Sequence, residues 1–214
     1  MRFQAIIFDL DGVICSTDEY HFQAWKKIAD ELDIPFDRTI NNRLRGVSRM
    51  QSLEIILENN PGDPFTDTEK QSLAADKNEI YKDLLSQMSE KDLSDEVRNT
   101  LNGLRDMGLR LAIGSSSKNT PLILSRIGLN GFFDAVSDGN NITHSKPHPE
   151  VFLKAAEMLD LFPQNCLVVE DAVSGAEAGH AAGMKVACVG DAAQQGAGDW
   201  NLTAFSELVS IVEG

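Results

Sequence analysis

Short runs of apolar residues alternate along the chain with longer segments in which apolar residues recur every three or four positions. Runs of the length expected for buried strands lie at 5–8, 109–114, 134–137, 166–169 and 186–189. Helical spacing predicts helices between the later runs, at 95–107, 120–127, 149–159 and 173–182. Because strands and helices alternate, we expect an α/β fold, with a Rossmann-like parallel sheet and helices on both of its faces.

Residues 17–88 lack this alternation and show only helical spacing. A stripe of apolar side chains that includes Trp25 runs along the first part of this segment. Helices are predicted at 19–32, 48–57 and 66–88, with a break at 59–64 that contains proline and glycine. We therefore expect a Rossmann-like core formed by residues 1–16 and 89–214, and a small all-helical cap domain, residues 17–88, inserted after the first strand.

Composition favours a folded chain that binds small molecules. With 214 residues, of which 42% are hydrophobic, the chain can bury a sizeable core. The formal net charge of −14 argues against nucleic-acid or anionic-membrane partners, since both require a basic surface. A phosphate ligand would need a local group of positive charges and a divalent cation. We expect a monomer.

The cysteines and the N-terminal segment favour a cytoplasmic protein. Cys15, Cys166 and Cys188 are odd in number and widely spaced, which is typical of small buried side chains and not of a disulfide or zinc framework. The apolar run at 5–8 ends at Asp9, so it is too short for a signal peptide. No segment of the sequence is long and apolar enough to span a bilayer.

The first predicted strand leads directly into Asp9-Leu10-Asp11-Gly12. Ligands of open parallel sheets bind beyond the carboxyl ends of the strands, which is where Asp9 and Asp11 project. An aspartate at such a place can act as a nucleophile or as a metal ligand. Taken alone, the segment can equally be a polar turn that closes a strand.

Three other loops carry polar residues of complementary chemistry. Residues 115–119, Ser-Ser-Ser-Lys-Asn, follow a strand and precede a helix, so hydroxyls and backbone N–H groups meet there as in a phosphate site. Glu170 and Asp171 follow another strand, and adjacent carboxylates suit Mg²⁺. Lys146 precedes a further helix. Alternatives stay open for each loop. Residues 115–119 can be a serine-rich helix cap, Glu170 and Asp171 a solvated helix start, and Lys146 a solvent-exposed lysine.

Together the four segments resemble the motifs of the haloacid dehalogenase superfamily of phosphotransferases, in the same order along the chain. The resemblance implies that Asp9 is the nucleophile that becomes an aspartyl phosphate and that Asp11 is the general acid and base. It further implies that Ser115 and Lys146 hold the transferring phosphoryl group. The implied ligands of one Mg²⁺ are Asp9, the backbone carbonyl of Asp11, Glu170 and Asp171.

Parts of the predicted cap resemble the β-phosphoglucomutase branch of this superfamily, above all residues 17–25 and 44–49. The resemblance implies that Arg49 grips the phosphate that is not transferred. The implied substrate-binding residues are Thr17, His21, Trp25, Arg45, Gly46, Val47, Ser48, Arg49, Lys77, Ser116, Ser117, Lys118 and Asn119. Surface ion pairing stays open as an alternative for Arg45 and Arg49, and packing within a helix for His21.

The activity implied by the resemblance is reversible conversion of β-D-glucose 1-phosphate to glucose 6-phosphate. Its activating intermediate would be β-glucose 1,6-bisphosphate. The alternative is a sugar-phosphate phosphatase of the same superfamily, which needs one phosphate site where a mutase needs two. A more distant alternative is a non-catalytic phosphosugar-binding sensor. Ser16 and Ala172 depart from the superfamily pattern, and we expect residues 190–199 to form a flexible loop without an assigned role.

Overall fold

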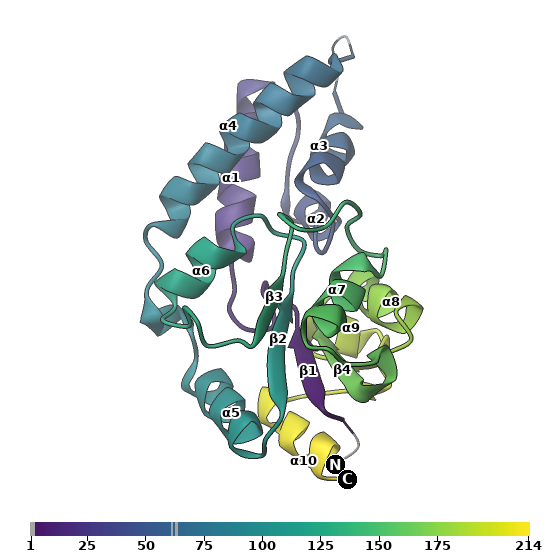
Figure 1. Ribbon diagram of the computed structural model, residues 1–214. Coiled ribbons are helices and arrows are strands. Elements are labelled where there is room, and N and C mark those ends of the chain that lie inside the picture. Colours follow the sequence, from purple (N-terminus) through teal and green to yellow (C-terminus); the bar gives the residue numbers. More distant parts are fainter. Residues whose placement is uncertain (1–2, 61, 63) are drawn as a thin grey trace.

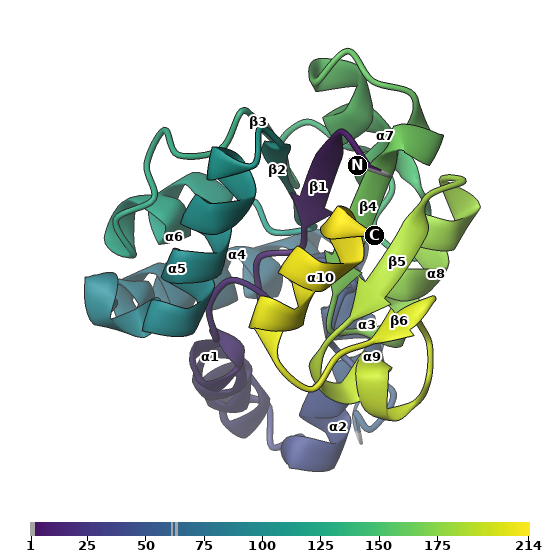
Figure 2. The ribbon, with the colours of Figure 1, turned by 90° about the horizontal axis from the view of Figure 1, so that it is seen from below.

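The computed structural model describes residues 3–60, 62 and 64–214. Pro61 and Asp63, in the predicted break at 59–64, lie outside the described residues. The strands form one parallel sheet in the order β3-β2-β1-β4-β5-β6 (Figures 1 and 2). They are β1 Ala5–Phe8, β2 Arg110–Gly114, β3 Ala135–Ser137, β4 Cys166–Glu170, β5 Lys185–Cys188 and β6 Trp200–Asn201. The prediction of a Rossmann-like parallel sheet is confirmed.

Some helices cover the two faces of this sheet, and others form a separate layer above it (Figures 1 and 2). They are α1 Asp18–Glu31, α2 Arg38–Asn42, α3 Arg49–Leu57, α4 Asp67–Leu85, α5 Asp95–Asp106, α6 Thr120–Arg126, α7 Glu150–Met158, α8 Val173–Ala181, α9 Gly190–Gln194 and α10 Leu208–Glu213. Short 3-10 turns lie at Glu90–Asp92, Pro163–Asn165 and Phe205–Glu207. Within the described residues, no helix is both long and apolar enough to cross a membrane.

Alternation along β1 sends successive side chains into two different hydrophobic clusters. Ile6 and Phe8 pack with residues of α5 and α10, whereas Ala5 and Ile7 pack with residues of α7 and α8. Each of these four side chains is fully buried, because in a parallel sheet helices cover both faces. The continuous apolar run in the sequence is the direct consequence of this double coverage.

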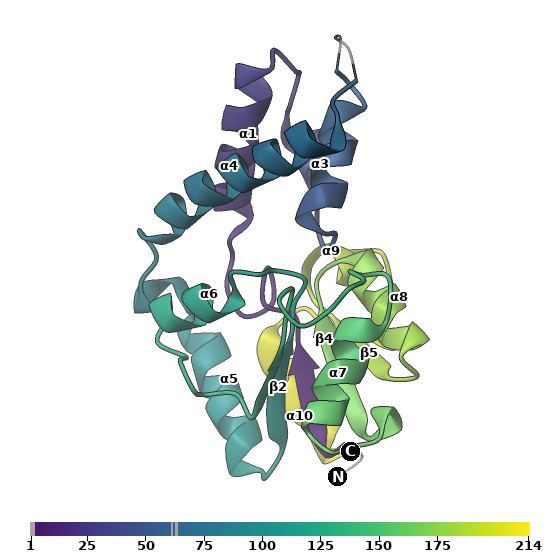
Figure 3. The same ribbon diagram turned by 45° about the horizontal axis from the view of Figure 1, so that its top comes forward.

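Helices α1 to α4 are inserted between β1 and β2 and lie above the carboxyl ends of the strands (Figure 3). They have a hydrophobic cluster of their own, which includes Trp25 and Ile28 of α1, Leu53 and Ile56 of α3, and Ala74 of α4. Capping boxes fix the starts of α3 and α4. Ser48 accepts from the amide of Gln51 at the start of α3, and Thr66 does the same for Glu69 at the start of α4.

The chain contains elements that the apolar pattern did not predict. Short helix α2 begins where the Asp37 side chain accepts a hydrogen bond from the Ile40 amide, and β6 has only two residues. The prediction of a flexible loop at 190–199 is wrong for its first half, which forms α9. Ala192 of α9 is fully buried against the sheet, and such packing of a small side chain leaves little hydrophobic signal in the sequence.

Candidate active site

Strand register brings the first and last acidic motifs together. Phe8 of β1 pairs with Val169 of β4, so the next residues, Asp9 and Glu170, stand side by side at the carboxyl ends of these strands. The Asp9 amide donates to the Val169 carbonyl at 2.9 Å and continues the ladder by one residue. The switch in strand order between β1 and β4 creates the crevice where ligands of this fold class bind.

Lys146 joins these two carboxylates from the loop before α7. Its Nζ lies 2.5 Å from Asp9 Oδ1 and 2.5 Å from Glu170 Oε1, and its side chain is 1% exposed. Burial lowers the pKa of Lys146, but the charges of Asp9 and Glu170 outweigh burial, so this pKa lies above its ordinary value. The lysine is therefore a fixed positive charge beside the predicted nucleophile.

Asp9, Glu170 and Asp171 together can hold a metal ion, because one carboxylate oxygen from each lies within 4.8 Å of the others. Burial raises the pKa of Asp171, and its negative neighbours Glu170 and Asp9 raise it further. A Cβ on Gly12 would meet Asp171 Oδ2 at 2.1 Å, so this glycine leaves the space that the carboxylate occupies. The hard oxygen donors fit Mg²⁺, and so does the net charge, because one lysine, Lys146, faces three carboxylates.

Asp11 lies beside this cluster, and its carboxylate accepts a hydrogen bond from the Thr17 hydroxyl. Burial, and then the charge of Asp9, raise the pKa of Asp11 from 3.8 to about 6 in spite of this hydrogen bond. A carboxyl group with a pKa near neutrality can both take up and release a proton during a reaction. The predicted role of Asp11 as general acid and base therefore has a physical basis.

Ser115 follows β2 directly and is 1% exposed. Its hydroxyl accepts from the Ser117 amide at 3.1 Å, and the Ser117 hydroxyl accepts from the Asn119 amide at 3.2 Å. These two hydrogen bonds fix the loop between β2 and α6. The loop also contacts the inserted helices, because the Asn119 amide group donates to Asn78 Oδ1 at 2.9 Å.

An aromatic cage in the inserted helices holds Lys77. Its Nζ lies 5.0 Å from the centre of the Trp25 ring, 4.4 Å from that of Tyr81 and 2.8 Å from His21 Nδ1. The rings of His21 and Tyr81 stack at 4.1 Å. Burial, and then the charge of Arg49, hold the pKa of Lys77 well below its usual range. His21 is thus a polar partner as well as a packed residue.

The sequence analysis missed Tyr81, although a signal for it exists. Lys77 and Tyr81 are four residues apart on α4, and His21 and Trp25 are four apart on α1, so each pair shares one helix face. Two facing helices with such pairs are able to form a cage, but only the packing of α1 against α4 brings them into contact.

A cavity of about 520 Å³ lies between the strand ends and the inserted helices. It brings together nearly the whole predicted site. The predicted site residues that line it are Asp9, Asp11, Thr17, His21, Trp25, Arg45, Gly46, Val47, Ser48, Arg49, Lys77, Ser115, Ser116, Ser117, Lys118, Asn119, Glu170 and Asp171. Lys146 is not a lining residue, because it is buried behind Asp9 and Glu170.

The two arginines of the predicted cap differ in their partners. Arg45 pairs with Asp18 at 3.4 Å and with Asp191 of α9, so the ion-pair alternative applies to it. Among the described residues, no carboxylate lies within ion-pair distance of the Arg49 guanidinium. Asp191 was missed by the sequence analysis, and no local signal marks it, because its partner is 146 positions away.

The parallel sheet and the acidic residues at its strand ends define a class of α/β proteins with a carboxylate cluster suited to Mg²⁺ in the crevice where ligands bind. The haloacid dehalogenase-like hydrolase family model matches residues 3–183, and the chain belongs to that family. Beta-phosphoglucomutase of Bacillus subtilis (strain 168) is 44% identical over 188 residues, which cover 87% of this chain and 83% of that protein. Members of the family typically depend on Mg²⁺, in agreement with the acidic cluster.

A solved structure and a phosphatase add to this comparison. The crystal structure of beta-phosphoglucomutase from Clostridium difficile has a TM-score of 0.92 and 34% identity, and covers 99% of this chain and 96% of that chain. Fructose-1-phosphate phosphatase YqaB of Escherichia coli (strain K12) is 31% identical over 86% of this chain and 94% of its own length. The wider set of relatives therefore includes both mutases and phosphatases.

Proposed function

We propose that the protein is a β-phosphoglucomutase, which interconverts β-D-glucose 1-phosphate and glucose 6-phosphate. One observation carries this assignment. A single cavity joins the predicted phosphoryl-transfer centre at Asp9 to Arg49, a guanidinium without an ion-pair partner among the described residues. A hexose bisphosphate has two phosphates, and this cavity offers the Arg49 guanidinium to one and the predicted transfer centre, with Lys146 behind it, to the other. The 44% identity to the Bacillus subtilis mutase supports the same substrate class.

In the first half of the proposed reaction, phosphorylated Asp9 donates its phosphoryl group to the 6-hydroxyl of the sugar. The bond between the Asp9 oxygen and phosphorus breaks as the bond to the sugar oxygen forms. Asp11 removes the proton of that hydroxyl, which its pKa of about 6 permits at neutral pH. The product is β-glucose 1,6-bisphosphate, with Arg49 on the phosphate that is not transferred.

In the second half, the bisphosphate reverses its orientation, and Asp9 takes the phosphoryl group from carbon 1. Asp11 returns its proton to the leaving oxygen, so that glucose 6-phosphate is released and the aspartyl phosphate is restored. Lys146 and Ser115 stabilise the transferring group, and Arg49 holds the phosphate on carbon 6. Mg²⁺, when bound by Asp9, the Asp11 carbonyl, Glu170 and Asp171, neutralises negative charge on the phosphoryl oxygens.

Exclusion of water distinguishes a mutase from a phosphatase, because hydrolysis of the aspartyl phosphate ends the cycle. We infer that residues 17–88 act as a cap domain on a core of residues 1–16 and 89–214. Contacts across this boundary support the inference. The Ser116 hydroxyl donates to the Gly46 carbonyl at 3.4 Å, Asn119 donates to Asn78, and Arg45 pairs with Asp191.

The test measures glucose 6-phosphate and free phosphate in parallel. Purified protein is incubated with Mg²⁺, β-glucose 1-phosphate and a trace of the 1,6-bisphosphate, with the α-anomer and Asp9→Asn as controls. We expect rapid formation of glucose 6-phosphate from the β-anomer alone, with little free phosphate. Stoichiometric phosphate without glucose 6-phosphate from this substrate would identify a phosphatase and refute the proposal.

A further inference from the structure

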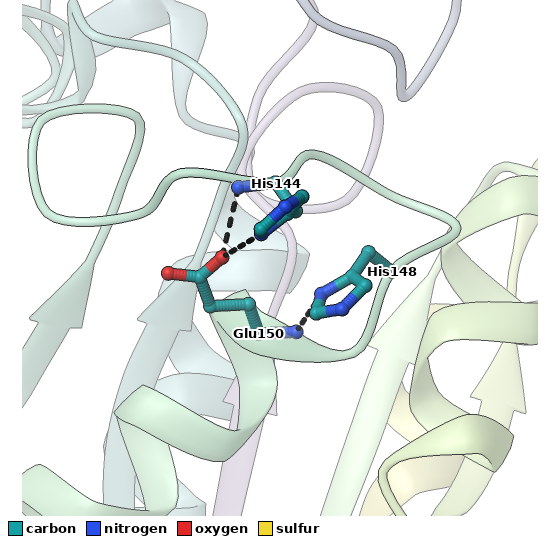
Figure 4. A group of neighbouring side chains, drawn as sticks. All are labelled: His144, His148 and Glu150. Atoms are coloured by element: carbon teal, nitrogen blue, oxygen red, sulfur yellow. Dashed lines mark hydrogen bonds and ion pairs between the residues drawn. The ribbon is translucent and has the colours of Figure 1, made fainter.

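The loop before α7 carries a group of polar residues that the proposed reaction does not use. His144, His148 and Glu150 lie close together on this loop and at the first turn of α7 (Figure 4). Both histidines are exposed, and none of the three residues lines the cavity. In the sequence they lie on either side of Lys146, whose side chain is buried and contacts Asp9 and Glu170.

Glu150 is held in place by the backbone of the same loop. Its Oε1 accepts from the Thr143 amide at 3.0 Å, and its Oε2 accepts from the His144 amide at 2.8 Å. Its own amide donates to His148 Nδ1 at 3.3 Å. The folded loop therefore already holds the carboxylate beside the two imidazoles, so ligand binding does not have to order this side chain.

The two imidazole rings face the same region of space. Their centroids are 4.6 Å apart with an angle of 32° between the planes, and His144 Nδ1 lies 3.0 Å from Glu150 Oε2. One possible ligand atom from each residue lies within 4.8 Å of the other two. A tetrahedral ion with bonds of about 2.1 Å holds its ligand atoms about 3.4 Å apart. Closure of the widest pair therefore requires a shift of at most about 1.4 Å, which rotation of exposed histidine side chains can provide.

We propose that His144, His148 and Glu150 form a second metal site, selective for a divalent transition-metal ion of the Zn²⁺ type. Two imidazoles and one carboxylate are a typical ligand set for Zn²⁺, and water completes the coordination. The oxygen donors of Asp9, Glu170 and Asp171 suit Mg²⁺ instead. Ligand chemistry thus separates the two sites.

The position of this site couples it to the loop conformation. The ligands at positions 144, 148 and 150 enclose the segment that contains Lys146, so a bound ion ties together both ends of that segment. Binding energy that depends on the folded loop stabilises the folded protein by mass action. The ion would therefore stabilise the conformation in which Lys146 reaches Asp9. This inference concerns a site outside the cavity and does not depend on the proposed sugar substrate.

The test is Zn²⁺ titration of the full chain by calorimetry in saturating Mg²⁺, without sugar phosphate. We expect one Zn²⁺ per chain in the wild type. His144→Gln and His148→Gln should each weaken binding by at least the roughly 10- to 100-fold loss that changes around metal ligands cause. His180→Gln is the matched control, because His180 lies on α8 and pairs with Asp199 at 3.1 Å, away from the cluster.

Cu²⁺ provides a spectroscopic check that identifies the ligands. In wild-type protein and in His180→Gln, the electron paramagnetic resonance spectrum should show coupling to two imidazole nitrogens, which the double variant His144→Gln/His148→Gln should lack. Zn²⁺ should raise the melting temperature of the first two proteins and not of the double variant. The proposal would be overturned if the wild type and the double variant bound Zn²⁺ with equal affinity, or if His180→Gln lost as much Zn²⁺ affinity as the double variant. Absence of nitrogen coupling in the wild-type spectrum would also overturn it.

Discussion

Replacing Lys146 with methionine removes one buried charge and keeps most of the side-chain volume. In the wild type, its ammonium group lies 2.5 Å from a carboxylate oxygen of Asp9 and 2.5 Å from one of Glu170. The side chains of Lys146 and Glu170 are each 1% exposed, and that of Asp9 is 10% exposed. Lys146→Met therefore leaves two buried carboxylates side by side without a compensating charge.

The magnitude follows from opposing electrostatic contributions. At 2.5 Å, each contact of Lys146 is worth about 7 kcal/mol of Coulomb attraction at an effective dielectric constant of about 20. Desolvation of each buried ion costs several kcal/mol, so the net stabilisation is much smaller. Removing one partner of a buried pair typically costs about 3–5 kcal/mol, because the remaining charge is unpaired. We expect a loss of this size in the free energy of unfolding.

The assay is urea unfolding at pH 7, in EDTA and again in Mg²⁺. In EDTA, Lys146→Met should lose about 3–5 kcal/mol, and Mg²⁺ should restore part of the loss because it binds the same carboxylates. The control is Lys185→Met, since Lys185 pairs with Asp199 with a half-exposed side chain, and such pairs contribute under about 1 kcal/mol. Adding Glu170→Gln should partly rescue Lys146→Met. Equal losses for the two lysine variants in EDTA would refute the argument.

Three further predictions concern the cavity and its boundary. Arg49→Ala should lower kcat/KM for the mutase reaction by about 10- to 150-fold, which corresponds to the loss of a hydrogen bond to a charged group. It should not affect formation of the aspartyl phosphate from a small donor. The control Arg43→Ala, which breaks an exposed ion pair, should leave both rates unchanged. Burial raises the folded-state pKa of Asp11 above its unfolded value, so its contribution to stability is present below pH 4 and is lost as pH rises through about 6. Asp11→Asn should therefore stabilise the metal-free protein at pH 7 by about 1–3 kcal/mol, with no gain at pH 3. Equal stability of the variant and the wild type in thermal melts at pH 7 would contradict this prediction. Asp191→Asn removes a half-exposed partner of Arg45 and should change the free energy of unfolding by under about 1 kcal/mol, so a loss above 2 kcal/mol in urea would show that the pair is stronger than its exposure implies.

Local patterns in the sequence contain much of the fold. The run at 5–8 predicts β1 with its observed bounds, because a strand buried on both faces must be apolar throughout. Helical spacing likewise places α1 and α4 within a few residues of their observed ends. Two of the elements that escaped prediction, α2 and α9, have a signal that is not hydrophobic, whereas α10, Leu208–Glu213, is an apolar segment that was not predicted. Helix α2 depends on the side-chain cap of Asp37, and α9 depends on burial of Ala192.

The candidate site shows the same division. Asp9, Asp11, Glu170 and Asp171 stand out in the sequence because they follow predicted strands, at the edge of a parallel sheet where ligands bind. The pairing register of β1 with β4 then places Asp9 beside Glu170, and no local pattern specifies that register.

The sequence by itself determined the α/β class, the helical insertion and the acidic residues at the strand ends, since each follows from local spacing and residue type. Tertiary structure alone decided which charges compensate one another. Lys146 reaches Asp9 across 137 positions, and Arg45 reaches Asp191 across 146. The ring of Tyr81 meets His21 only because α1 packs on α4. Such contacts depend on the path of the whole chain, because electrostatic and packing energies depend on distance in space and not on separation in sequence.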